Sequence, residues 1–85
     1  MNLRGKTALV TGGGTGIGRA TSIALADRGA AVAVNYSRSK AEAEETAALI
    51  RSRGGQAIAV QADVSRDQDV RLMAETVVRA FGTID

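Results

Sequence analysis

The chain has 85 residues, of which 45% are hydrophobic and only two are aromatic, and its net charge is +2. A chain of this length forms one domain at most, and its hydrophobic fraction excludes an intrinsically disordered protein. The absence of cysteine and histidine excludes disulfides and metal sites built from these residues. The basic residues are dispersed among nine acidic ones, a pattern that does not indicate nucleic-acid binding.

The chain opens with MNLRGKTALV, which lacks the long apolar run of a signal peptide or a membrane span. We therefore expect a cytoplasmic protein with no membrane partner. Within this stretch an aliphatic run begins at Thr7 and ends abruptly in glycines after Thr11, as a buried strand ends in a loop.

Three short apolar runs alternate with three segments of helical character. Strands are expected at residues 7–11, 30–36 and 56–61. Glycines that could cap the helices follow the helical segments at Gly29, Gly54 and Gly82. The alternation predicts an α/β fold, a three-layer Rossmann architecture with a parallel sheet and right-handed crossovers.

Two serines predict where the second and third helices begin. Glu42 follows Ser39 by three residues, and Gln68 follows Ser65 by three, which is the spacing of a capping box. The apolar face of the second helix is expected to contain Ala43, Ala47 and Ile50. The corresponding face of the third helix is expected to contain Val70, Met73, Val77 and Phe81.

Residues 83–85 have the pattern of an approach to a fourth strand. A doubly wound sheet consists of two halves, each with three strands and their helices. The sequence supplies one such half. We therefore expect residues 1–85 to form the amino-terminal part of a single Rossmann domain that continues into a fourth strand.

The segment TGGGTGIG, residues 11–18, lies between the first strand and the first helix. Glycines at such a junction allow a tight turn and let backbone N–H groups approach a pyrophosphate, while the helix N-terminus adds partial positive charge. Gly12 would make the turn, and Gly16 and Gly18 would permit close contact with the ligand. A flexible glycine-rich turn without a ligand is the alternative.

Two other glycine motifs do not fit this segment. The pattern G-x-G-x-x-G fails because its third glycine would fall on Ile17 or on Arg19. The P-loop pattern can start at Gly13, but it requires lysine and then serine or threonine where this chain has Arg19 and Ala20. Without the lysine and the hydroxyl, the P-loop chemistry is lost.

The pattern Thr11-Gly12-x-x-x-Gly16-Ile17-Gly18 after a first strand resembles the cofactor signature of the short-chain dehydrogenase/reductase family. Three further segments lie where that family places them, so the resemblance covers the whole chain: Gly29-Ala30, Asp63-Val64 and Phe81-Gly82-x-Ile84-Asp85. A narrower resemblance is to 3-oxoacyl-acyl carrier protein reductases. Gly14 departs from the family, because many members have a serine there that can contact the cofactor.

The resemblance implies an enzyme that transfers hydride between a nicotinamide and a carbonyl/alcohol pair, commonly as a dimer or tetramer. It also implies that Asp63 accepts a hydrogen bond from the adenine amino group and that Val64 lies beside the adenine ring. The expected cofactor-binding residues are Gly12, Gly14, Thr15, Gly16, Ile17, Gly18, Tyr36, Ser37, Arg38, Asp63 and Val64.

The end of the second strand decides between NAD and NADP in dinucleotide-binding folds. NAD-using relatives would have an aspartate at the position of Tyr36, and no acidic residue lies between Ala30 and Lys40. Arg38 can pair with a 2′-phosphate, and Ser37 can add a hydroxyl donor. We therefore expect NADP(H) to be preferred over NAD(H). The alternative is that Arg38 is one more exposed basic residue.

Tyr36 and Lys40 have the Tyr-x-x-x-Lys spacing that short-chain reductases use in catalysis. In the family that pair shares one helix face, whereas here Tyr36 ends a strand and Lys40 begins a helix. We therefore predict no catalytic residue in this chain, and we expect the family's catalytic residues to lie beyond Asp85. Alone, the 85 residues should be inactive. The alternative function is a noncatalytic dinucleotide-binding or regulatory module.

Overall fold

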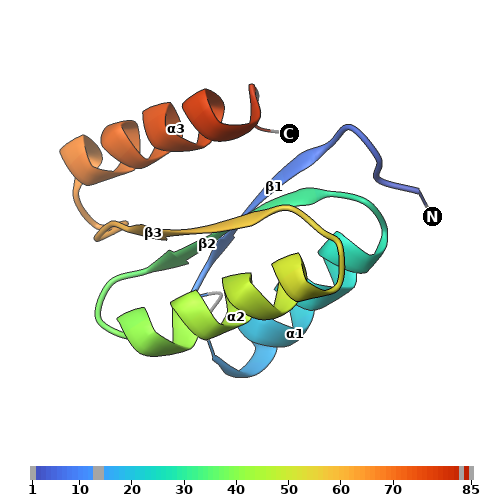
Figure 1. Ribbon diagram of the computed structural model, residues 1–85. Coiled ribbons are helices and arrows are strands. Elements are labelled where there is room, and N and C mark those ends of the chain that lie inside the picture. Colours follow the sequence, from blue (N-terminus) through green and yellow to red (C-terminus); the bar gives the residue numbers. More distant parts are fainter. Residues whose placement is uncertain (1, 13–14, 83, 85) are drawn as a thin grey trace.

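The computed structural model describes residues 2–12, 15–82 and 84, and its elements follow the predicted order (Figure 1). The strands are β1 (Thr7–Thr11), β2 (Ala31–Tyr36) and β3 (Ala57–Gln61). The helices are α1 (Gly16–Asp27), α2 (Lys40–Ser52) and α3 (Asp67–Phe81). The α/β architecture predicted from the alternation of apolar runs and helical segments is therefore confirmed.

The three strands form one parallel sheet in the spatial order β1-β2-β3. The register pairs Thr7 with Ala31 at one end of the β1–β2 ladder and Thr11 with Asn35 at the other. In the β2–β3 ladder the last pair is Tyr36 with Gln61. The carboxyl ends of all three strands therefore lie along one edge of the sheet.

The helices cover both faces of the sheet, α1 and α2 on one face and α3 on the other (Figure 1). Successive side chains of β2 alternate between these faces, as in any strand. Val32 and Val34 are fully buried in the cluster that includes Ile50 of α2. Ala33, between them, belongs to the cluster that contains Met73 and Val77 of α3. This alternation produces the three layers.

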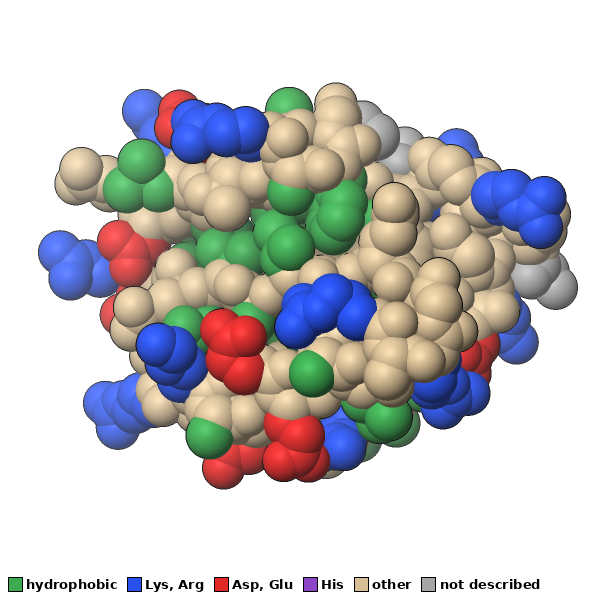
Figure 2. Space-filling view, in the orientation of Figure 1, with side chains coloured by type: hydrophobic (Ala, Val, Ile, Leu, Met, Phe, Trp, Pro, Cys, Tyr) green, Lys and Arg blue, Asp and Glu red, His purple; other side chains and the backbone are tan. Residues whose placement is uncertain are grey.

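Helix α3 covers its face of the sheet only in part. Met73 and Val77 are buried and Phe81 is half-buried, whereas Val70 is exposed, so only part of the predicted apolar stripe of α3 packs on the sheet. Leu9 and Ile58 on the same side are also only partly buried. Figure 2 shows hydrophobic side chains gathered between α3 and the sheet on the face that it presents.

The ends of the helices agree only in part with the sequence-based expectations. Gly29, Gly54 and Gly82 have φ values of 102°, 87° and 90°, the left-handed conformation expected at or just past a helix end. The predicted start of α2 at Ser39 is confirmed, but neither predicted capping box forms its side-chain bond. Ser39 is the N-cap of α2, but its backbone (φ −89°, ψ 61°) is outside the β region and its side chain makes no capping bond. The N-cap of α3 is Arg66 rather than Ser65.

Two strands start one residue later than expected, at Ala31 and Ala57. In the part of the chain that the structure describes, no helix has the length and apolarity needed to cross a membrane. The same residues contain no group of three acidic side chains arranged to hold a metal ion.

Candidate functional site

Three loops meet at the carboxyl edge of the sheet, one after each strand. The glycine-rich loop follows β1, Ser37 and Arg38 follow β2, and Asp63 and Val64 lie just beyond β3. A backbone hydrogen bond from the N–H of Ala62 to the Tyr36 carbonyl (2.9 Å) extends the β2–β3 ladder past the end of β3. The parallel sheet therefore brings the loops that carry Gly12, Arg38 and Asp63 to one edge.

The glycine-rich loop leads directly from β1 into α1. Gly12 and Gly16 have φ values of 63° and 54°, which side-chain-bearing residues rarely adopt. A Cβ atom at either position would meet no described residue beyond its chain neighbours and its own helix within 4 Å, so the backbone conformation and not space requires glycine there. The predicted helix start near Gly16 is confirmed. Gly14, also expected to bind the cofactor, lies outside the described residues.

The amino-terminal end of α1 has features that are typical of an anion-binding helix start. Its N-cap, Thr15, is extended and makes no side-chain capping bond, and the first turn contains no acidic residue. Among the described residues, none accepts a hydrogen bond from the N–H groups of Gly16, Ile17 and Gly18. Unpaired N–H groups at a helix start, together with the helix dipole, attract phosphate. The first turn of α3, by contrast, carries Asp67 and Asp69.

Arg38 lies beside this helix end, across a small hollow of about 260 Å³ lined by Gly12, Thr15, Tyr36, Ser37, Arg38 and Ser39. Within the described ranges Arg38 forms no ion pair. Arg19 pairs with Glu45 and Arg53 pairs with Asp27, each at 2.8 Å. The guanidinium of Arg38 is therefore available to bind a phosphate. The guanidinium of Arg19, at the position of the P-loop lysine, is paired with the Glu45 carboxylate.

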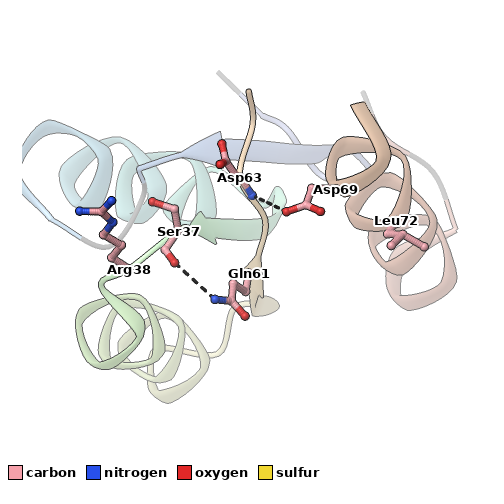
Figure 3. Close-up of a pocket in the computed structure, with 6 residues that line it drawn as sticks. All are labelled: Ser37, Arg38, Gln61, Asp63, Asp69 and Leu72. Atoms are coloured by element: carbon pink, nitrogen blue, oxygen red, sulfur yellow. Dashed lines mark hydrogen bonds between the residues drawn. The ribbon is translucent and has the colours of Figure 1, made fainter. Parts of the chain in front are cut away.

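A second hollow of about 750 Å³ adjoins the first, since Ser37 and Arg38 line both. Its other lining residues are Gln61 and Asp63, at and just beyond the end of β3, and Asp69 and Leu72 of α3 (Figure 3). The side chain of Arg38 points away from Gln61 and Asp63 in this view. Val64, expected beside adenine, is 53% exposed. An exposed valine after a buried strand suits the face of a planar ring.

The carboxylate of Asp63 is held by its neighbour Ser65. Its Oδ1 accepts a hydrogen bond from the Ser65 hydroxyl (2.6 Å) and another from the Ser65 N–H (2.9 Å). The hydroxyl bond and then the backbone bond are the main causes that lower the pKa of Asp63, with smaller contributions from the charges of Arg66 and Arg38. Asp63 is therefore an ionised acceptor, and no described residue donates to its Oδ2.

Tyr36 and Lys40 do not form a catalytic pair in this structure. Tyr36 is the last residue of β2 and packs against the cluster on the α1/α2 face, while Lys40 is the first residue of α2. A turn separates them, so they do not share the helix face that the family's catalytic pair requires.

Three polar residues of this region were missed by the sequence analysis. Gln61 donates to the Ser37 carbonyl at 3.4 Å, Asp69 accepts from the N–H of Asp63 at 3.0 Å, and Asn35 is a buried polar residue in β2. The sequence did mark Asn35 as unusual, because it is the one amide side chain in the otherwise apolar segment AVAVNY. Asp69 gave only a weak signal, as an acidic residue in the first turn of a helix.

A family model for the short chain dehydrogenases matches residues 6–85. The chain belongs to this family. It is 61% identical over 85 residues to the short-chain dehydrogenase/reductase homolog YusS of Bacillus subtilis and covers 78% of it. It is 47% identical to the hydroxynaphthalene reductase arp2 of Aspergillus fumigatus, again over all 85 residues, and covers 31% of that protein.

The fold agrees with solved structures of the family. A crystal structure of a short chain dehydrogenase from Burkholderia cenocepacia in complex with NADP is 45% identical and superposes with a TM-score of 0.93. The match covers all of this chain and 35% of that one. The chain therefore spans about a third of the length of arp2 and of this dehydrogenase, but most of the length of YusS. The relatives bear the names of several reductases, so the narrower likeness to 3-oxoacyl-acyl carrier protein reductases stays a prediction.

Proposed function

We propose that residues 1–85 bind the adenine dinucleotide end of NADP(H) for a short-chain oxidoreductase that interconverts a carbonyl compound and an alcohol. The narrower substrate class implied by the sequence resemblance is a 3-oxoacyl thioester on acyl carrier protein. The observation that carries the proposal is Arg38: it lies just past the end of β2, has no carboxylate partner among the described residues and lines the same hollow as Thr15, the N-cap of α1.

The residues present fit this ligand in three places. The N–H groups at the start of α1 suit the pyrophosphate, because Gly12 and Gly16 bring the backbone close. Arg38 and Ser37 suit a 2′-phosphate, since a guanidinium binds phosphate through paired hydrogen bonds. The ionised carboxylate of Asp63 suits the adenine amino group. These are the places at which the family resemblance puts the cofactor.

The bound dinucleotide supplies the hydride, and the residues of this chain bind and orient it. We propose that the groups that protonate the substrate oxygen lie outside residues 1–85, in agreement with the separation of Tyr36 from Lys40. We also propose that the complete enzyme is cytoplasmic and acts as a homo-oligomer.

The test is a fluorescence titration of the full-length protein with NADPH and with NADH. We expect tighter binding of NADPH, because only NADPH carries the 2′-phosphate that Arg38 would bind. Equal affinities would contradict the proposed preference, and the absence of binding to either dinucleotide would contradict the proposed function.

A noncatalytic dinucleotide-binding module is a second candidate, favoured by one observation. The chain covers 78% of YusS but only 31% of arp2, so a relative not much longer than these 85 residues exists in the family. A module of this kind would bind NADPH yet reduce no ketone or 3-oxoacyl substrate as full-length protein. Steady-state oxidation of NADPH with a panel of such substrates separates the two candidates.

A further inference from the structure

The peptide unit that joins Ala62 to Asp63 is held at both ends by side chains from other elements. Its carbonyl oxygen, on Ala62, accepts a hydrogen bond from Nδ2 of Asn35 at 3.2 Å. Its N–H, on Asp63, donates to Oδ2 of Asp69 at 3.0 Å (Figure 3). A peptide unit is planar, so fixing both of its polar groups fixes its orientation.

Asn35 reaches this peptide from the centre of the sheet. It is 3% exposed, and its amide also contacts the Val60 carbonyl at 3.3 Å. Ala62 lies one residue beyond the end of β3, so the Asn35 amide bonds a carbonyl that the strand ladder does not reach. Ala62 itself is 3% exposed, and a buried carbonyl left without a donor would be costly.

Asp69 reaches the same peptide from the opposite side. It is the third residue of α3, and its carboxylate extends back past the N-cap Arg66 to the N–H of Asp63. Asp67 lies in the same helical turn with the same charge, but it forms no hydrogen bond or ion pair with another described residue. Both aspartates can therefore interact favourably with the dipole of α3, but only Asp69 bonds the peptide N–H of Asp63.

We propose that Asn35 and Asp69 are positioning residues for recognition of the adenine amino group, acting through Asp63. The peptide unit they hold sets the direction of the Asp63 side chain, whose Oδ1 is already bound by Ser65. The side chains of Asn35, Asp69 and Ser65 therefore fix the direction of Oδ2 before any ligand binds. A preorganised acceptor loses less entropy on binding and therefore discriminates more strongly between ligands that do and do not donate to it.

This inference rests on the proposed function, because it takes the ligand of Asp63 to be the adenine amino group. The test compares NADPH with its hypoxanthine analogue, in which an oxygen replaces that amino group. Dissociation constants of the full-length protein for both are measured by fluorescence titration, and their ratio reports adenine recognition alone. A change in overall stability or in phosphate binding would weaken both ligands equally.

Asp69→Ala should weaken NADPH binding about threefold to tenfold, the loss expected for one hydrogen bond, and should leave the hypoxanthine analogue within about twofold. Asp69→Asn retains an acceptor and should keep the wild-type ratio. Asp67→Ala, the matched control on the same helical turn, should behave as wild type. Asn35→Ala should lower the ratio in the same sense as Asp69→Ala. Asn35→Ala leaves the buried carbonyl of Ala62 without this donor, so the folding of the variant is checked first by circular dichroism.

The possible outcomes separate the inference from the proposed function. If Asp69→Ala keeps the wild-type ratio while Asp63→Ala loses it, the positioning role is overturned and the cofactor site stands. If Asp69→Ala and Asp67→Ala lower the ratio alike, the helix charge and not the peptide contact is responsible, and the inference is again overturned. If wild type and Asp63→Ala have the same ratio, Asp63 does not recognise adenine, and that part of the proposed function falls together with the inference.

Discussion

The side-chain amide of Gln61, at the end of β3, donates a hydrogen bond to the carbonyl oxygen of Ser37, just past the end of β2, at 3.4 Å. This contact ties together the two loops that carry Arg38 and Asp63. The charges of the two residues also interact, because Arg38 contributes to the lowered pKa of Asp63. The segments proposed to bind the 2′-phosphate and the adenine are therefore linked at the sheet edge by a hydrogen bond and by the attraction between their charges.

Arg38→Ala should remove most of the preference for NADPH over NADH. The loss of a charge-assisted contact to the phosphate should cost about 1.5–3 kcal/mol, or about tenfold to 150-fold in NADPH affinity, with little effect on NADH. Titration of wild type and variant with both cofactors measures this. Arg53→Ala is the control, since Arg53 is an exposed arginine paired with Asp27 and away from the site. Equal weakening of the two cofactors by Arg38→Ala would show that Arg38 does not bind the phosphate.

Ser65→Ala should raise the pKa of Asp63 toward its ordinary value of 3.8, since the Ser65 hydroxyl bond is the main cause of the lowering. A lowered pKa in the folded state means that ionised Asp63 stabilises the protein above the ordinary pKa, and that this contribution is lost as the pH falls through the folded-state pKa. The carboxyl carbon of Asp63 can be titrated by NMR in both proteins. An unchanged titration midpoint in the variant would refute the assigned cause.

Gly16→Ala should destabilise the protein by about 1–2 kcal/mol, because the residue has φ 54° and a side chain of L configuration is strained there. The space is open, so the cost is conformational. Urea unfolding of full-length protein measures it. D-alanine at the same position, introduced by chemical ligation, adopts positive φ without strain and should restore wild-type stability. If both alanines destabilise equally, the methyl group and not the backbone is the cause.

The 85-residue chain in isolation should show no NADPH-dependent ketone reduction and should self-associate. Among the described residues β1 pairs only with β2, which leaves an unpaired strand edge, and hydrophobic side chains lie open between α3 and the sheet (Figure 2). Both features promote association with other chains. Light scattering should show oligomers or aggregates, and Val78→Lys, at an apolar position of α3 that is 44% exposed, should reduce them. A monodisperse, cooperatively melting monomer of the unmodified chain would contradict the expectation.

Much of the fold could be predicted from local sequence, for identifiable reasons. Short aliphatic runs bounded by glycines specified strands, and their alternation with helical segments specified a parallel sheet. Positive φ at Gly29, Gly54 and Gly82 confirms the three helix ends that the sequence predicted. At the site, Gly12, Gly16, Arg38 and Asp63 come together as expected, because carboxyl ends of parallel strands share an edge.

The remaining features depend on contacts that local patterns do not contain. The Ser65 capping box fails because the Ser65 hydroxyl donates to Asp63 instead, and α3 begins at Asp67, one residue later than a Ser65 N-cap would place it. Ser39 is the N-cap of α2 as predicted, but its backbone lies outside the β region and its side chain makes no capping bond. The contact of Asn35 with Ala62 joins residues 27 positions apart and exists only in the observed register of β2 and β3. No spacing rule along the chain could have predicted it.

The order of the strands in space has a geometric consequence for any ligand at this edge. Neighbouring strands lie about 4.8 Å apart, so the ends of β1, β2 and β3, from which the three loops start, lie in a row with that step. The N–H groups near Gly16, the guanidinium of Arg38 and the carboxylate of Asp63 follow this sequence. A molecule that contacts all three must lie across the strand ends rather than along a strand. Because β2 lies between β1 and β3, it separates the group that the first loop binds from the group that the third loop recognises.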